Sequence, residues 1–156
     1  MPISKILSGS LDSGKVLEVS QAITSASQTS SSQTSLVDIT GATLTVTPKS
    51  TSNKILLMFD LGAYTNSGST FPIPYYAIVR GSTVLHAKSG WYLDARSSGT
   101  VFGQQLWRTG MHFLDSPSTT SATTYKLQYK SASGGSGHPI LGIEEGSVFT
   151  LMEISG

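Results

Sequence analysis

The sequence contains no cysteine, and this absence excludes several kinds of chemistry. Without thiols the chain has no disulfide, no thiolate metal site and no cysteine nucleophile. Exported domains of this size often depend on disulfides, so the absence favours assembly in a reducing cytoplasm.

Charged side chains are also scarce. They make up 12% of the 156 residues, about half the usual share, with ten basic residues against nine acidic ones. This balance provides no broad cationic face for phosphate groups, so we expect no nucleic-acid binding. It also leaves little net charge to keep copies of the chain apart, which favours oligomerisation.

Long apolar runs are missing as well, including at the start of the chain. We therefore expect neither a signal peptide nor a membrane span. Ile3, Ile6 and Leu7 stand among serine and glycine residues, which disfavour a helix. We expect residues 1–14 to form an extended N-terminal arm, with a frayed terminus as the alternative.

No pattern of catalytic or metal-binding residues is present. His86, His112 and His138 have no His, Cys or Asp two or four positions away, so metal-ligand spacing is absent. A weak ion site of His138 with Glu144 and Glu145 is the alternative to an ordinary loop histidine. The chain has no Gly-X-Ser-X-Gly elbow and no phosphate loop, so we expect no enzymatic activity and no cofactor.

The chain does contain many short alternating segments rich in Thr, Val and Tyr. Thr43–Thr47 and Tyr125–Tyr129 follow the period of two that is typical of half-buried strands. Ile55–Leu61 is apolar at almost every position, which predicts a strand covered on both faces. Gly81-Ser82, between two such segments, predicts a hairpin with a type II′ turn.

The remaining segments fit the same pattern. Further strands are expected at 15–24, 36–39, 100–114, 123–131 and 147–154. Between them we expect a loop or flexible edge at 24–35, loops at 65–74 and 89–99, a turn at Thr40-Gly41, and bulges or bends at Gly103 and Gly110. The result is about eight or nine strands and no βαβ alternation. We predict an all-β fold, an antiparallel β-sandwich that is jelly-roll-like, in a single domain over residues 15–156.

The loop at 89–99 carries Trp91, Tyr92 and Arg96, residue types that dominate protein interfaces. We expect these side chains to contact a neighbouring subunit or a ligand such as a sugar ring. The alternative is that Trp91 covers the open end of the sandwich.

Several segments resemble a recurrent module of tailed-phage virion proteins, in particular cyanophage-like ones from phages of marine and freshwater bacteria. They are Gly14–Val19, Leu36–Gly41, Leu44–Leu57, Phe113–Tyr129 and Phe149–Ile154. Such modules occur in tail fibres and in proteins that decorate the head. The resemblance implies a jelly-roll-like β fold that is usually trimeric, and it carries over no catalytic residue.

The chain has neither the long shaft nor the tail-attachment domain that is usual in a fibre. We therefore expect a capsid decoration or cement protein, a homotrimer on the surface of the virion head that is made in the host cytoplasm. Ile3, Ile6 and Leu7 would anchor it to the major capsid protein, with Trp91 and Tyr92 in subunit contacts. The alternative is a short tail fibre that binds tail proteins and a host glycan; a cellular carbohydrate-binding module is a third possibility.

Overall fold

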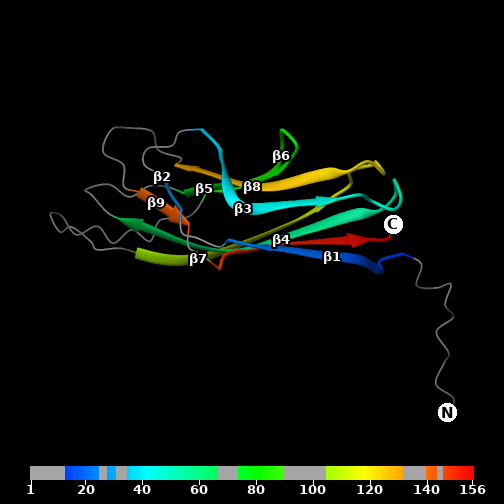
Figure 1. The fold of residues 1–156 in the computed structure, drawn as a ribbon, viewed down its shortest axis with the longest axis horizontal. Coiled ribbons are helices and arrows are strands. Elements are labelled where there is room, and N and C mark those ends of the chain that lie inside the picture. The colour runs from blue at the N-terminus through cyan, green and yellow to red at the C-terminus, as the bar shows by residue number, and fades with distance from the viewer. Residues whose placement is uncertain are drawn as a thin grey trace, which may run out of the picture.

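In the computed structural model, the chain folds into two antiparallel β-sheets that pack face to face (Figure 1). The structure describes residues 13–24, 28–30, 35–66, 74–89, 105–131, 140–143 and 146–156. These residues include no helix, and so none that is long and apolar enough to cross a membrane. The predicted all-β antiparallel sandwich is confirmed.

The described residues form ten strand segments. They are β1 (Val16–Ile23), β2 (Gln28–Ser30), β3 (Val37–Val46), β4 (Lys54–Asn66), β5 (Pro74–Arg80), β6 (Thr83–Ser89), β7 (Gln105–Asp115), β8 (Thr123–Ser131), β9 (Ile140–Ile143) and β10 (Val148–Ile154).

Two pairs of these segments are halves of interrupted strands. β10 and β9 pair with successive parts of β4, and β1 and β2 pair with β10 and β9 in turn. Ten segments with two interruptions therefore give eight strands in two layers of four. One layer has the order β1/β2, β10/β9, β4, β7, which we call the first sheet, and the second sheet has the order β3, β8, β5, β6. This is the strand order of a jelly roll.

Where the two strands are interrupted, hydrogen bonds of Thr24 and Ser147, including those of their hydroxyls, take the place of regular backbone pairing. The Thr24 N–H donates to the Ser147 carbonyl at 2.9 Å, and the Ser147 N–H donates to the Thr24 hydroxyl at 3.0 Å. The Ser147 hydroxyl also accepts a bond from the Gly62 N–H on β4, at 3.0 Å. Because Thr24 and Ser147 are buried, these bonds satisfy backbone groups that water does not reach.

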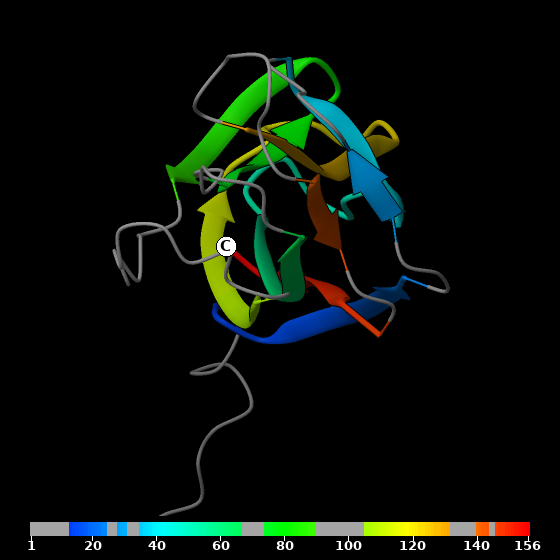
Figure 2. The same ribbon diagram turned by 90° about the vertical axis from the view of Figure 1, so that its left-hand side faces the viewer.

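The core lies between the sheets and follows from strand alternation (Figure 2). On β4, Ile55, Leu57, Phe59 and Leu61 point inward and are at most 6% exposed. Side chains of the second sheet meet them, such as Tyr76, whose ring lies edge-on to Phe59 at 6.4 Å. These inward positions of β4 are thus apolar because they face the opposite sheet.

The predicted hairpin is confirmed. β5 and β6 are joined by Gly81 and Ser82, and Gly81 has a φ of 57°. A positive φ at the first central residue alone is the signature of a type II′ turn, and glycine adopts it without steric cost.

One local prediction was right in part, and two were wrong. The stretch 24–35, expected as a loop or flexible edge, contains the short edge strand β2, which β9 holds by backbone pairing without any large apolar side chain. Thr40-Gly41 is not a turn between two strands but an irregularity inside β3, where Gly41 has a φ of 83°. Gly110 lies in an unbroken ladder opposite Asp60 rather than at a bulge; a Cβ there would lie 3.3 Å from the Phe59 carbonyl oxygen.

Candidate interaction surface

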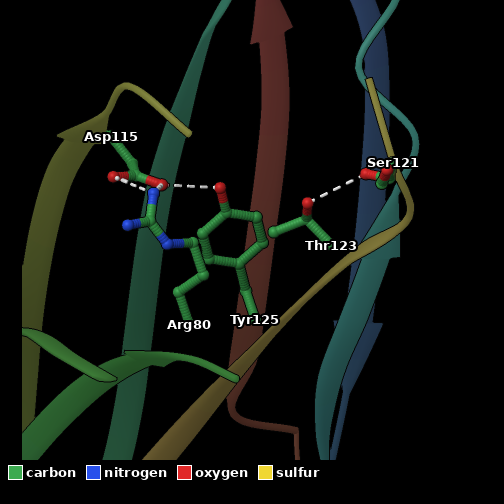
Figure 3. Close-up of polar contacts among 5 residues, drawn as sticks. All are labelled: Arg80, Asp115, Ser121, Thr123 and Tyr125. Carbon is green, nitrogen blue, oxygen red and sulfur yellow. Dashed lines mark hydrogen bonds and ion pairs between the residues drawn. The ribbon is translucent and has the colours of Figure 1, made fainter. Parts of the chain in front are cut away.

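One buried polar cluster connects the two sheets, and Figure 3 shows it in close-up. Asp115 ends β7 in the first sheet, whereas Arg80 and Tyr125 come from β5 and β8 in the second. The Arg80 guanidinium donates to both Asp115 oxygens, at 3.1 and 2.8 Å, and the Tyr125 hydroxyl donates to Oδ2 at 2.7 Å. Since Asp115 is only 6% exposed, these bonds provide the partners that a buried carboxylate requires.

This cluster has the geometry of a structural clamp. Burial, and then the hydrogen bond to Asp115, raise the pKa of the Tyr125 hydroxyl above its ordinary value of 10.0. A tyrosine held neutral in this way donates a hydrogen bond and is a poor base or nucleophile. The hydrogen bonds of this cluster therefore serve to hold the two sheets together.

A second buried carboxylate fixes the turn that precedes β4. Glu153 on β10 is fully buried, and its Oε1 accepts from the Lys49 backbone N–H at 2.7 Å and from the Asn53 amide at 2.6 Å. Asn53 Oδ1 in turn accepts from the Gly156 N–H at 3.3 Å. The three contacts bind the turn at 48–53 to the C-terminal strand.

On the second sheet, the outward positions of β3 and β8 are polar, and their groups pair with one another. Asp38 on β3 accepts from Lys126 and from Gln128 on β8, each at 2.7 Å. Further along the same two strands, the hydroxyls of Thr45 and Thr124 lie 2.9 Å apart. Such cross-strand pairs suit a face that meets water.

The outward face of the first sheet is apolar instead. Strand register places Val19, Met152, Leu56 and Leu114 in one row across all four strands. More apolar side chains flank this row on the same face, namely Val16, Ile23, Met58, Val148 and Ile154. We call these nine residues the apolar face.

Several residues of the apolar face are strongly exposed. Val19 is 57% exposed, Ile23 56% and Leu114 47%, and no described element covers them (Figure 1). The sequence predicted that the strand at Ile55–Leu61 would be covered on both faces, and within the described part of this chain it is covered on one. Exposed contiguous apolar surface of this kind marks an interaction site.

The site residues predicted from the sequence fall in segments that the structure does not describe. Ile3, Ile6 and Leu7 lie outside the described residues, as do Trp91, Tyr92 and Arg96. Of the predicted arm, Gly14 is described, and its N–H donates to the Ser155 carbonyl at 2.8 Å, so the end of that segment is already bound to the sheet.

The histidines do not form a metal site among the described residues. His86 stacks on Phe113 with ring centroids 5.6 Å apart, and His112 lies on the outward face of β7 opposite Met58. His138 lies outside the described part of the chain. Within that part, no group of three His, Cys, Asp or Glu residues could hold a metal ion.

Comparison with known proteins adds little to what the structure shows. The chain matches no protein-family model, and no curated protein matches its sequence. Among solved structures, it is similar to dimeric latent PorU from Porphyromonas gingivalis, with 9% sequence identity and a TM-score of 0.47. The match covers 92% of this chain and 14% of the PorU chain, and a likeness this distant indicates no function.

Proposed function

We propose that this protein is a non-enzymatic structural component of a tailed-phage virion, a decoration or cement protein of the head. The observation that carries the proposal is the contrast between the two outward faces. On the second sheet, polar side chains of β3 and β8 are satisfied by one another, whereas the first sheet offers apolar side chains from all four of its strands. A protein with one such face functions by covering it with another protein.

The resemblance of Gly14–Val19, Leu36–Gly41 and Leu44–Leu57 to phage virion modules supports the virion as the place where this happens. In this proposal the protein forms a trimer, and each trimer bridges adjacent copies of the major capsid protein. The added buried area then resists the pressure of the packaged DNA. In this proposal the protein acts by binding other proteins and catalyses no reaction.

Quantitative mass spectrometry of purified virions tests the proposal through the copy number relative to the major capsid protein. A number in the hundreds per particle supports a head decoration protein. A few copies to a few tens would indicate the alternative, a tail component that binds a host glycan. Absence from virions would overturn both functions.

A truncation tests the role of the N-terminal segment. Deleting residues 1–13 retains Gly14 and its bond to Ser155, so we expect a folded protein. If Ile3, Ile6 and Leu7 anchor the chain, this truncated protein no longer co-sediments with capsids that lack the wild-type protein. Full-length protein is the control, and undiminished binding of the truncated protein would contradict the anchoring role.

A further inference from the structure

On the outward side of the first sheet, charged side chains lie only at the two ends of the apolar face. Lys54 begins β4 at one end of the face. Asp60, six residues along the same strand, lies at the other end, where Arg108 pairs with it at 3.6 Å. Between them the face holds the apolar rows and a few neutral polar groups, such as Gln21, whose amide donates to Thr150 at 3.2 Å.

The charges of this arrangement are complementary in one orientation. When two copies of the face are stacked with their β4 strands antiparallel, Lys54 of each copy lies over Asp60 of the other. When the strands are parallel, Lys54 lies over Lys54 and Asp60 over Asp60. Opposite charges therefore meet only in the antiparallel stack. In that stack the strand register places Leu56 over Met58, Val19 over Gln21 and Leu114 over His112.

The size of the face indicates how strong such a contact is. Four strands at a spacing of about 4.8 Å and seven residues at about 3.4 Å each span roughly 450 Å². Two such faces bury roughly 900 Å² in total, below the range of about 1,200–2,000 Å² for stable complexes. A contact of this size is weak in free solution and becomes significant where the protein is concentrated.

We propose that the apolar face is a homotypic interface, in which two copies of this chain pack sheet on sheet about a two-fold axis with antiparallel β4 strands. The face favours this contact over pairing at the edge of β1, because the Lys49 ammonium donates to the Leu17 carbonyl at 3.3 Å and blocks that edge. The contact goes beyond the proposed function in naming what covers the apolar face, which is a second copy of this chain and not the capsid. In a trimeric protein it would join one trimer to the next, since a two-fold contact does not close a ring of three.

Analytical ultracentrifugation of the full chain over a range of about 1–100 μM, chosen for a weak interface, tests the proposal. The double variant Val19→Lys/Leu114→Lys introduces charges at two exposed positions, so we expect it to fold. It should halve the mass of the wild-type assembly, from dimer to monomer or from a paired trimer to a trimer. Val84→Lys is the matched control, since Val84 is 46% exposed but lies on β6 in the second sheet, and it should leave the mass unchanged.

Two outcomes overturn the proposal. Equal masses for the wild type and the double variant, as measured on variants with native circular dichroism, would show that no copy occupies the face. A fall from trimer to monomer would place the face in a three-fold contact instead. Each result leaves the copy number in virions, and hence the proposed function, as a separate question.

A charge exchange tests the antiparallel orientation. All variants carry Arg108→Gln, which removes the partner of Asp60 within the same chain. In this background Lys54→Asp or Asp60→Lys alone places like charges opposite each other, and each should weaken association about tenfold. Lys54→Asp/Asp60→Lys together should restore it; if association stays weak in the exchanged pair, the antiparallel arrangement is wrong.

Discussion

Asp115 is the residue through which the two sheets are bound at one end of the sandwich. It accepts from Arg80 and from Tyr125, both on the opposite sheet. Tyr125→Phe removes one donor to a buried charged group, so we expect a loss of about 2 kcal/mol in the free energy of unfolding. Urea denaturation measures this loss, and a change near zero would show that the clamp does not stabilise the fold.

The same tyrosine predicts how stability responds to alkali. The pKa of its hydroxyl is raised in the folded protein, chiefly by burial, whereas the unfolded chain ionises near 10.0. The contribution of this group is therefore complete below pH 10 and is lost as the pH rises above it. Stability of the wild type should fall more steeply above pH 10 than that of Tyr125→Phe, and equal slopes would contradict the assignment.

Asp38 predicts a loss of folding stability at acid pH, whereas Tyr125 predicts one at alkaline pH. The hydrogen bond from Lys126, followed by that from Gln128, lowers the pKa of this carboxyl below its usual 3.8. Its contribution is present above pH 3.8 and disappears as the pH falls through the lower folded value. Because the group is exposed, we expect Asp38→Asn to cost about 0.5 kcal/mol at pH 7. Thermal melts should show that this cost disappears in strong acid.

Among the elements, the β5–β6 hairpin offers the most local test. Gly81 has a positive φ, and a Cβ built on it meets nothing within 4 Å. Gly81→Ala should therefore cost only backbone strain, about 1 kcal/mol, while Gly81→Asn should cost less because asparagine tolerates this conformation better. Chemical denaturation of both variants measures this order, and the reverse order would argue against strain as the cause.

The elements that could be predicted are those whose signal is local. A glycine at the first turn position identified the β5–β6 hairpin, and alternation identified β1, β8 and β10. β2 and β9 escaped prediction because three or four residues carry no detectable period. β9 forms beside β4, and β2 forms beside β9, so both depend on strands that are distant in sequence. The fold was thus predictable as a sandwich, and its interrupted strands were not.

The candidate surface was only partly visible in the sequence. The run Ile55–Leu61 is apolar at both inward and outward positions, and this was the available signal. What it could not show is that Val19, Met152 and Leu114, distant in sequence, extend the same row. Their alignment depends on strand register, which is a property of the folded sheet.

At the scale of the whole molecule, association through the apolar face should appear in thermal stability. A contact that only the folded chain can make raises the melting temperature as the protein concentration rises. We expect this dependence for the wild type and for Val84→Lys, and its loss in Val19→Lys/Leu114→Lys. Differential scanning calorimetry at several concentrations measures it; a melting temperature that does not change with concentration in the wild type would contradict self-association.

The hydrogen bonds of Gly14 and Lys15 with Ser155 bring two distant parts of the sequence together at one end of the sandwich. Lys15 and Ser155 are paired there as if they were neighbours in a hairpin, since the Ser155 N–H donates to the Lys15 carbonyl at 2.9 Å. A short peptide could therefore join these ends, and new termini could be opened elsewhere. For the same reason the domain could be inserted into a surface turn of an unrelated protein, because both of its ends would meet that turn at one place.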